Sequence, residues 1–232
     1  MLAFAAKDIK FQRCETDLQV KAEWHKNFNG GFIPVLESPD GTMINESAVI
    51  ANFACDFARG QGLPLWPHEA APEGDVAAHM ETGQHRLAMQ KFDSLLMGSF
   101  WRPYMNRFTD ETHIAELKAQ FPAIEEFFKK HMNGNNFLSG RDEPMMIDVH
   151  CFPMAERLIL LEGTEWNYAF EALDIKNAVP TMYDYVHRMQ AHPKFANYIA
   201  RRGIYDAQLK RQSAKPLGEK AQLAVEYLGE AR

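Results

Sequence analysis

The sequence predicts an α+β protein in which a small region with strands precedes a larger region made only of helices. Three observations favour this class. An Asp-Gly turn at residues 40–41 separates two short apolar runs, which is a specific signal for a β-hairpin. Prolines and glycines crowd residues 60–74, as they do in a linker between domains. Beyond this linker, apolar residues recur at spacings of three and four, which is typical of helices.

The small region should contain strands and helices in alternation. Its pattern predicts a strand over 11–18, a helix over 20–28, a strand over 32–36, a short strand at 43–44, and a helix that begins at Glu46 or Ser47 and ends at Gly60. The last helix should bury four apolar residues that lie at helical spacing: Val49, Ile50, Phe53 and Phe57. We therefore place the first domain at 1–62 and the linker at 63–74.

The larger region, 75–212, should be all helix. Helices are expected over 76–107, 114–132, 146–161, 181–190 and 193–200. Pro103 should kink or end the first of them, and Thr109 or Asp110 should cap the second. The tail, 213–232, mixes charged and apolar residues and is either a short extra helix or a frayed end.

Composition excludes several classes of function. Hydrophobic residues make up 46% and charged residues 24% of the chain, the balance of an ordinary globular protein. The 31 acidic and 25 basic residues form no block of like charge, which argues against nucleic acid or an anionic membrane as a partner. No apolar run approaches the ~20 residues of a membrane span, and the apolar start of the chain is too short for a signal peptide. We therefore expect a cytoplasmic protein that binds small molecules or proteins.

The cysteines and histidines point to no metal site and no disulfide framework. Cys14, Cys55 and Cys151 are odd in number and widely separated, which fits a reducing compartment. We expect all three to be buried structural residues, because free cysteine commonly behaves as a small hydrophobe. No histidine pair has the i, i+4 spacing of a helical zinc site.

Several short segments together resemble one known family. They are Lys21-Ala22-Glu23-Trp24, Ile33-Pro34-Val35-Leu36-Glu37, Glu46-Ser47-Ala48-Val49-Ile50, and Phe137-Leu138-Ser139-Gly140 followed by Ile147-Asp148. With the order of strands, linker and helices, they make nearly the whole chain similar to omega-like glutathione transferases. The resemblance implies an incomplete thioredoxin-like domain followed by an all-helical glutathione-transferase-like domain.

The resemblance also implies a binding site for glutathione, as a co-substrate, in the first domain. A cis peptide before Pro34 would expose the backbone of Ile33 to the ligand. Glu46 and Ser47 would hold the γ-glutamyl end at a helix start, where unpaired N–H groups attract a carboxylate. Lys21 would pair with the glycyl carboxylate. Each residue also has a simpler interpretation, namely a trans proline in an edge strand, an ordinary helix cap and a solvated lysine.

Two further sets of residues belong to the helical domain. The family's hydrophobic-substrate pocket would be lined by Phe100, Tyr104, Arg157 and Tyr205, although most aromatic residues of this long helix should be core. Asp148 matches a buried residue that organises the turn before a core helix, which concerns stability under either interpretation. The preceding cap position holds Met145 rather than Ser or Thr, which would forfeit roughly 1 kcal/mol of capping.

The family's catalytic motif has no counterpart here. Members begin with a strand and a helix whose start carries a catalytic Cys, Ser or Tyr, and residues 1–7 match only the end of that helix. We therefore expect no catalytic residue in this chain. Three explanations stay open: an incomplete gene model or isoform, a strand supplied by a partner, or evolution into a non-enzymatic subunit.

Two functions follow from these motifs and from the missing one. The first is a glutathione transferase-like protein that binds glutathione, with thiol transferase or reductase activity only when the missing segment is supplied. Its second substrate would be a hydrophobic or thiol-reactive small molecule. The alternative is a non-catalytic structural or interaction subunit, and either form could be a homodimer or part of a larger assembly.

Overall fold

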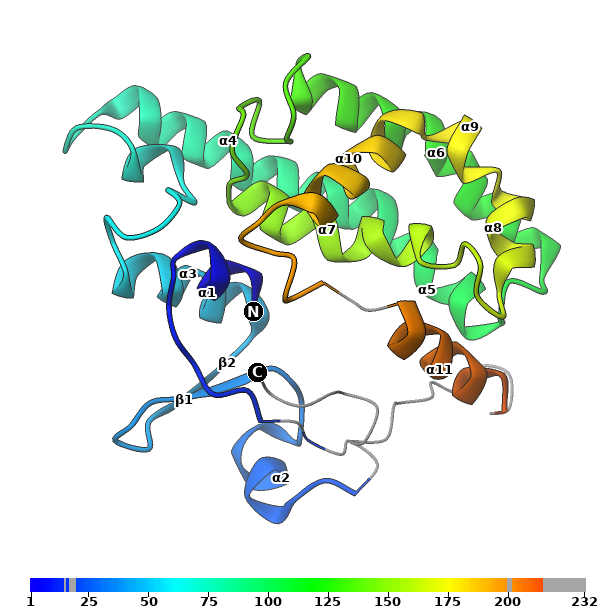
Figure 1. Ribbon diagram of the computed structural model, residues 1–232, viewed down its shortest axis with the longest axis horizontal. Helices are drawn as coiled ribbons and strands as arrows, with labels where there is room; N and C mark the ends of the chain where they lie inside the picture. The colour runs from blue at the N-terminus through cyan, green and yellow to red at the C-terminus, as the bar shows by residue number, and fades with distance from the viewer. Residues whose placement is uncertain (15, 17–19, 200–201, 215–232) are drawn as a thin grey trace.

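The computed structural model describes residues 1–14, 16, 20–199 and 202–214. Its first region holds a two-stranded sheet with three helices, and its second is helical, which confirms the predicted α+β class (Figure 1). The elements of the first region are α1 (Leu2–Ala6), α2 (Glu23–Asn29), β1 (Val35–Glu37), β2 (Met43–Asn45) and α3 (Ser47–Phe57).

The second region begins with a short 3-10 helix. Its elements are η1 (Pro67–Glu69), α4 (Val76–Phe92), the π-helix η2 (Asp93–Met97), α5 (Gly98–Met105), α6 (Glu111–Met132), α7 (Met146–Ile159), α8 (Asn167–Leu173), α9 (Ile175–Ala178), α10 (Pro180–Ala191) and α11 (Arg202–Ser213). In Figure 1 the helices α4 to α10 lie together on one side of the molecule, and the sheet with α1, α2 and α3 lies on the other.

The predicted hairpin is confirmed. β1 runs antiparallel to β2 with Leu36 opposite Ile44. The turn between them is closed by Asp40, whose carboxylate accepts a hydrogen bond from the Thr42 amide at 3.0 Å, and by Gly41, whose φ of +83° is a conformation that favours glycine. The Asp-Gly signal therefore identified the turn between the two strands.

The predicted strand over 11–18 is wrong for the residues that the structure describes there. Residues 11–14 form no ladder, and Phe11 packs edge-on against Phe4 of α1, with ring centroids 5.3 Å apart. It also stacks on Tyr198 of the helical region at 6.0 Å. The aromatic side chain thus joins α1 to the second region, and the described residues offer this segment no neighbouring strand to pair with.

Helix α3 begins at Ser47, as predicted, but it ends at Phe57. Of the four residues predicted to be buried, only Ile50 is buried, whereas Val49 is 52%, Phe53 36% and Phe57 69% exposed; Ala54 and Cys55 are buried instead. The reason is tertiary: α1 packs beside α3 (Figure 1), and Ile50 and Ala54 belong to the same buried cluster as Ala3 and Phe4 of α1. Periodicity identified the helix but could not say which of two apolar stripes would find a partner.

Most of the helical region matches its prediction. The helix that starts at Val76 continues through η2 to Met105, two residues beyond Pro103. Asp110 caps α6, because its carboxylate accepts hydrogen bonds from the amides of Thr112 and His113 at 2.9 and 3.3 Å. The predicted helix over 193–200 is wrong for 193–199, where Phe195 and Tyr198 close successive turns instead. The tail at 215–232 lies outside the described residues.

Asp148 lies buried in the helical region, near the start of α7. Its two carboxylate oxygens accept hydrogen bonds from the amides of Leu138 and Met145, at 2.7 and 2.9 Å. Asp148 is completely buried, and this burial raises the pKa of its carboxyl to about 7, against the opposing effect of the two backbone donors. The motif therefore ties the loop before α7 to the start of that helix, as expected for a structural residue.

A buried ion pair joins the end of α1 to η1, the first element of the second region. Lys7 donates to a carboxylate oxygen of Glu69 at 2.5 Å and to the carbonyl of Leu63 at 3.2 Å, and its side chain is 1% exposed. Backbone hydrogen bonds continue the connection, from Leu63 to Ala6 and from Met146 to Leu65. Among the described residues, no helix is long and apolar enough to cross a membrane.

Candidate functional site

The hairpin brings the predicted binding residues of the first region together. Val35, the first residue of β1, lies opposite Asn45, the last residue of β2. Pro34, which precedes β1, and Glu46, which follows β2, are therefore neighbours at the same end of the hairpin. The Ile33–Pro34 peptide bond is cis, as the resemblance implied. Ile33 is 58% exposed, and in the described part of the chain neither its amide nor its carbonyl has a hydrogen-bond partner.

The start of α3 adds a second set of unpaired donors. The first hydrogen bond of this helix runs from the amide of Ile50 to the carbonyl of Glu46, so the amides of the three residues between them have no intrahelical partner. Glu46 has a φ of +69°, a strained conformation for a residue with a side chain. Its carboxylate and the Ser47 hydroxyl are exposed and make no hydrogen bond within the described residues.

Lys21 lies across the loop that leads to Ile33. Its ammonium group donates to the carbonyl of Gly30 at 3.2 Å and stands 5.3 Å from the ring centroid of Phe32. A Cβ atom at Gly31 would be 2.4 Å from the lysine Cδ, which shows how closely the side chain follows the loop. Lys21 therefore lies against the loop that precedes Ile33, while the unpaired peptide group of Ile33, the Glu46 carboxylate and the N-terminus of α3 lie at one end of the hairpin.

Two further residues of this loop were not predicted from the sequence. His25 and Asn29 both donate to the carbonyl of Phe32, at 2.7 and 2.9 Å. The signal that could have identified Asn29 is its position before Gly30 and Gly31, since asparagine before glycine commonly closes a turn with its side chain. Nothing in the sequence pattern distinguishes His25.

The residues predicted to line a substrate pocket do come together, but as part of the core. The rings of Phe100 and Tyr104 stack with centroids 5.4 Å apart, and the Tyr205 hydroxyl donates to the carbonyl of Arg157 at 3.4 Å. Both tyrosines are buried, and burial raises the pKa of each. That these residues line a substrate pocket stays a prediction.

Neither of the two buried cysteines, Cys55 and Cys151, has the environment of an activated thiol. Burial, and to a smaller degree the charge of Glu69, raises the pKa of Cys55 to about 12. Burial also raises the pKa of Cys151. Both are structural residues, as predicted, whereas Cys14 is exposed and so contradicts the expectation that all three would be buried.

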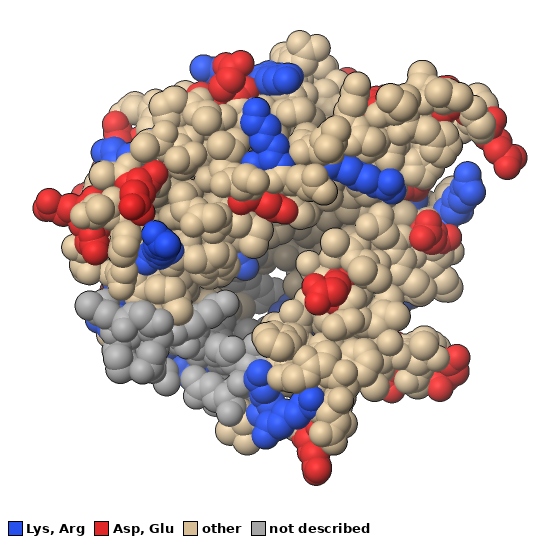
Figure 2. Space-filling model, turned by 180° about the vertical axis from the view of Figure 1, so that it is seen from behind, with Lys and Arg blue, Asp and Glu red and all other residues tan. Residues whose placement is uncertain are grey.

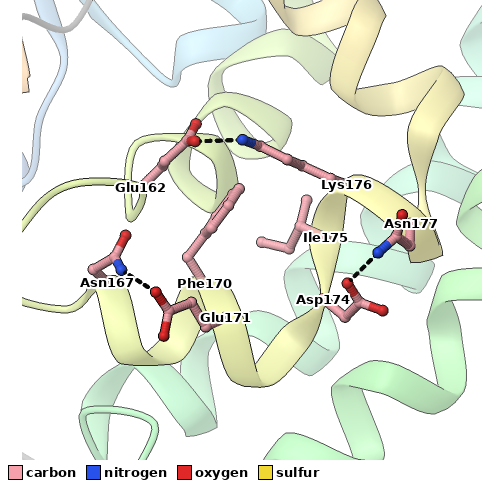
Figure 3. Close-up of a pocket in the computed structure, with 8 residues that line it drawn as sticks. All are labelled: Glu162, Asn167, Phe170, Glu171, Asp174, Ile175, Lys176 and Asn177. Atoms are coloured by element: carbon pink, nitrogen blue, oxygen red, sulfur yellow. Dashed lines mark hydrogen bonds and ion pairs between the residues drawn. The ribbon is translucent and has the colours of Figure 1, made fainter.

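One cavity lies away from the hairpin and holds no predicted site residue. Its volume is about 360 Å³, and it lies at α8 and α9 of the helical region (Figure 3). Its polar groups already pair with one another: Lys176 binds Glu162 at 2.6 Å, Asn167 binds Glu171 at 2.7 Å, and Asn177 binds Asp174 at 2.8 Å. The cavity therefore offers a ligand few free polar partners.

The face of the molecule seen in Figure 2 carries charges of both signs. Acidic and basic side chains are interspersed over the face seen in Figure 2, without one broad patch of either sign. This distribution agrees with the absence of like-charge blocks in the sequence. Among the described residues, no group of histidine, cysteine and acidic side chains is arranged to hold a metal ion.

Comparison with known proteins identifies relatives of this chain. No family model matches the sequence. A probable glutathione S-transferase of Zea mays is 30% identical over 206 residues, which cover 84% of this chain and 78% of the relative. Glutathione S-transferase omega-1 of Mus musculus is 28% identical over 171 residues, which cover 71% of this chain and 63% of the mouse protein.

Solved structures show the same fold. A trimeric glutathione transferase of Leishmania superposes with a TM-score of 0.69 at 21% identity, over 92% of this chain and 44% of that one. A rice glutathione S-transferase solved in complex with glutathione superposes with a TM-score of 0.67 at 18% identity, over 90% of this chain and 87% of that one. The thioredoxin-like and all-helical architecture is thereby confirmed, and the chain belongs to the glutathione S-transferase family.

Proposed function

We propose that this chain binds glutathione at the end of the hairpin, through Lys21, Ile33, Pro34, Glu46 and Ser47. The observation that carries the proposal is the unpaired backbone of Ile33 beside the open N-terminus of α3. An extended peptide can pair with the first, and a carboxylate can bind at the second. Glutathione is an extended peptide with a carboxylate at each end.

Each part of glutathione would meet a complementary group. The α-carboxylate of the γ-glutamyl residue would accept hydrogen bonds from the first amides of α3 and from Ser47, and its ammonium would face the carboxylate of Glu46. The cysteinyl backbone would pair with Ile33. The glycyl carboxylate would pair with Lys21, whose ammonium would exchange its bond to the carbonyl of Gly30 for the ligand.

The reaction that we propose is transfer to, or reduction of, a hydrophobic or thiol-reactive small molecule, with glutathione as co-substrate. Its second substrate would approach the cluster of Phe100, Tyr104, Arg157 and Tyr205. We assign no residue of this chain the role of activating the thiol. We place the protein in the cytoplasm, because all three of its cysteines are free and a reducing compartment keeps them so.

A second candidate function is favoured by the outer face of α3. Val49, Phe53 and Phe57 form an exposed apolar stripe, and within the described residues β1 pairs with β2 on one edge only. Exposed apolar stripes and open strand edges are typical of surfaces that bind another chain. Under this proposal the protein is a non-catalytic subunit of a homodimer or a larger assembly, and the glutathione site only binds its ligand.

Isothermal titration with glutathione tests the proposed site. We expect Ser47→Ala to weaken binding about tenfold or more, since a hydrogen bond to a charged group contributes roughly 1.5–3 kcal/mol. Ser94→Ala, an exposed serine on the remote η2, is the matched control and should leave binding unchanged. If the wild-type chain binds no glutathione, the proposed site is wrong.

A thiol-transferase assay on the same samples separates the two candidate functions. Turnover that depends on Ser47 would favour the enzyme. Glutathione binding without turnover would favour the interaction subunit.

A further inference from the structure

The carbonyl oxygen of Phe32 is held from two sides by side chains of α2. The Nε2 atom of His25 lies 2.7 Å from it, and the Nδ2 atom of Asn29 donates to it at 2.9 Å. A carbonyl oxygen can only accept, so His25 must carry its proton on Nε2. Two donors on one oxygen leave it little freedom to turn.

The side chain of His25 is held in place by burial and by an aromatic neighbour. It is 1% exposed, and its ring stacks on that of Trp24 with centroids 5.1 Å apart. Its other ring nitrogen, Nδ1, is buried and has no hydrogen-bond partner within the described residues. A buried polar atom without a partner destabilises the folded state. The hydrogen bond from Nε2 to the Phe32 carbonyl is the polar contact that this imidazole makes within the described residues.

Asn29 closes the same loop with its other side-chain atom. Its Oδ1 accepts hydrogen bonds from the amides of Gly31 and Phe32, at 3.1 and 3.0 Å. Gly30 and Gly31 have φ values of +74° and +75°, which glycine adopts without strain. The segment from Asn29 to Phe32 is therefore a closed turn whose last peptide group is clamped.

The clamp acts on Ile33 because of the geometry of the peptide group. The carbonyl of Phe32 and the amide of Ile33 belong to one planar unit, and in a trans peptide the C=O and N–H bonds point in opposite directions. Only the following bond, Ile33–Pro34, is cis. Holding the Phe32 oxygen toward His25 and Asn29 therefore aims the Ile33 N–H away from α2, where it has no partner within the described residues.

We propose that His25 and Asn29 are positioning residues that aim the Ile33 amide at the cysteinyl carbonyl of glutathione. The proposal rests on the glutathione site proposed above and adds to it residues that do not touch the ligand. Because the peptide group is oriented before binding, ordering it costs less free energy when the ligand arrives. The ring of Phe32 also faces Lys21, so the same clamped residue helps to place the cation of the site.

Variants of the two donors test this role by titration with glutathione. His25→Phe keeps an aromatic ring but removes the donor, and Asn29→Asp keeps the acceptor Oδ1 but removes Nδ2–H. We expect each to weaken glutathione binding roughly fivefold, the equivalent of one hydrogen bond. His25→Gln, whose amide nitrogen can reach the position of Nε2, should restore most of the affinity.

The chemical shift of the Ile33 amide in 15N-labelled protein is a second measurement. It should change if His25 and Asn29 orient this amide, and it should not change if they only stabilise the fold. In the wild type it should shift when glutathione is added. In His25→Phe and Asn29→Asp it should differ already in the free protein, with thermal unfolding showing that each variant remains folded. Asn29 is partly exposed, so its variant keeps the test open if His25→Phe does not fold.

Three results would overturn the proposal. One is unchanged glutathione affinity in both donor variants. Another is a loss of affinity that His25→Gln does not restore, with the Ile33 resonance unmoved. The third is a wild-type chain that binds no glutathione, which refutes the underlying site as well. If the wild type binds glutathione and Ser47→Ala weakens this binding, but the donor variants do not, the glutathione site stands. The positioning role of His25 and Asn29 is then refuted.

Discussion

Asp148 shows how one buried carboxyl makes the stability of this protein depend on pH. In the folded chain its pKa is raised to about 7 from the ordinary value of 3.8, because the carboxylate is removed from water. The folded state therefore binds a proton more tightly than the unfolded state does. Its contribution to stability is fully present below about pH 4 and is lost as pH rises through about 7.

We predict that Asp148→Asn removes this pH dependence. The asparagine has one oxygen for two backbone donors, so at pH 5 the variant should be less stable than the wild type by about 1–3 kcal/mol. The difference should narrow between pH 5 and pH 8, because only the wild type must ionise a buried group. Urea unfolding of both proteins at intervals across this range measures it, and parallel stability curves would contradict the assignment.

At the candidate site, the residues that face outward could be predicted and those behind them could not. Ile33, Pro34, Glu46 and Ser47 stand in short patterns whose chemistry is local: a proline before a strand, and an acid and a hydroxyl at a helix start. His25 acts through a carbonyl seven residues away. Its role depends on how α2 meets the following loop, and no spacing rule encodes that contact.

At the scale of elements, glycines decide how closely segments of the first region approach one another. Gly62 has a φ of +63°, and a Cβ added to it would lie 2.2 Å from the carbonyl oxygen of Ala6. The neighbouring amide of Leu63 donates to that same oxygen at 2.8 Å. The linker therefore rests directly on the end of α1. Gly60 has a similar φ of +78°, but nothing lies within 4 Å of its added Cβ.

The pair Gly62→Ala and Gly60→Ala separates close approach from backbone conformation. Both variants should be destabilised by a left-handed conformation that alanine rarely adopts. Gly62→Ala should lose roughly 1–3 kcal/mol more, because its Cβ meets the backbone of α1 rather than a flexible side chain. Chemical unfolding of the two variants measures the difference. Equal losses would mean that the linker can move away from α1 with little loss of stability.

At the scale of the whole molecule, the ion pair between Lys7 and Glu69 links α1 of the first region to η1 of the second. Both side chains are almost completely buried, at 1% and 4% exposed. Glu69 also accepts from the amide of Trp66 at 3.1 Å, and Lys7 donates to the carbonyl of Leu63. The pair is thus surrounded by partners, as buried charges must be.

We predict that Lys7→Met destabilises the protein by roughly 3–5 kcal/mol, because it leaves the carboxylate of Glu69 buried without its cation. The double variant, Lys7→Met with Glu69→Gln, should recover part of that lost stability, since no buried charge of this pair then remains. Unfolding of the wild type, both single variants and the double variant completes the cycle. Additive losses would show that the two residues do not interact as the distance between them indicates.

The sequence by itself determined the elements whose signals are local. The Asp-Gly turn, the start of α3, the cap at Asp110 and the long helices were each predicted from neighbouring residues, since turns, caps and helical periodicity act over a few positions. The similarity of motifs was enough to expect a glutathione transferase fold.

Only the tertiary structure decided which faces of these elements are covered. It placed Phe11 between α1 and Tyr198 rather than in a strand, and it buried Ile50 while leaving Phe57 exposed. It also brought Lys7 to Glu69 and closed the aromatic cluster around Tyr104. These outcomes depend on partners far away in the chain, because burial and pairing are properties of the assembled surfaces and not of any single segment.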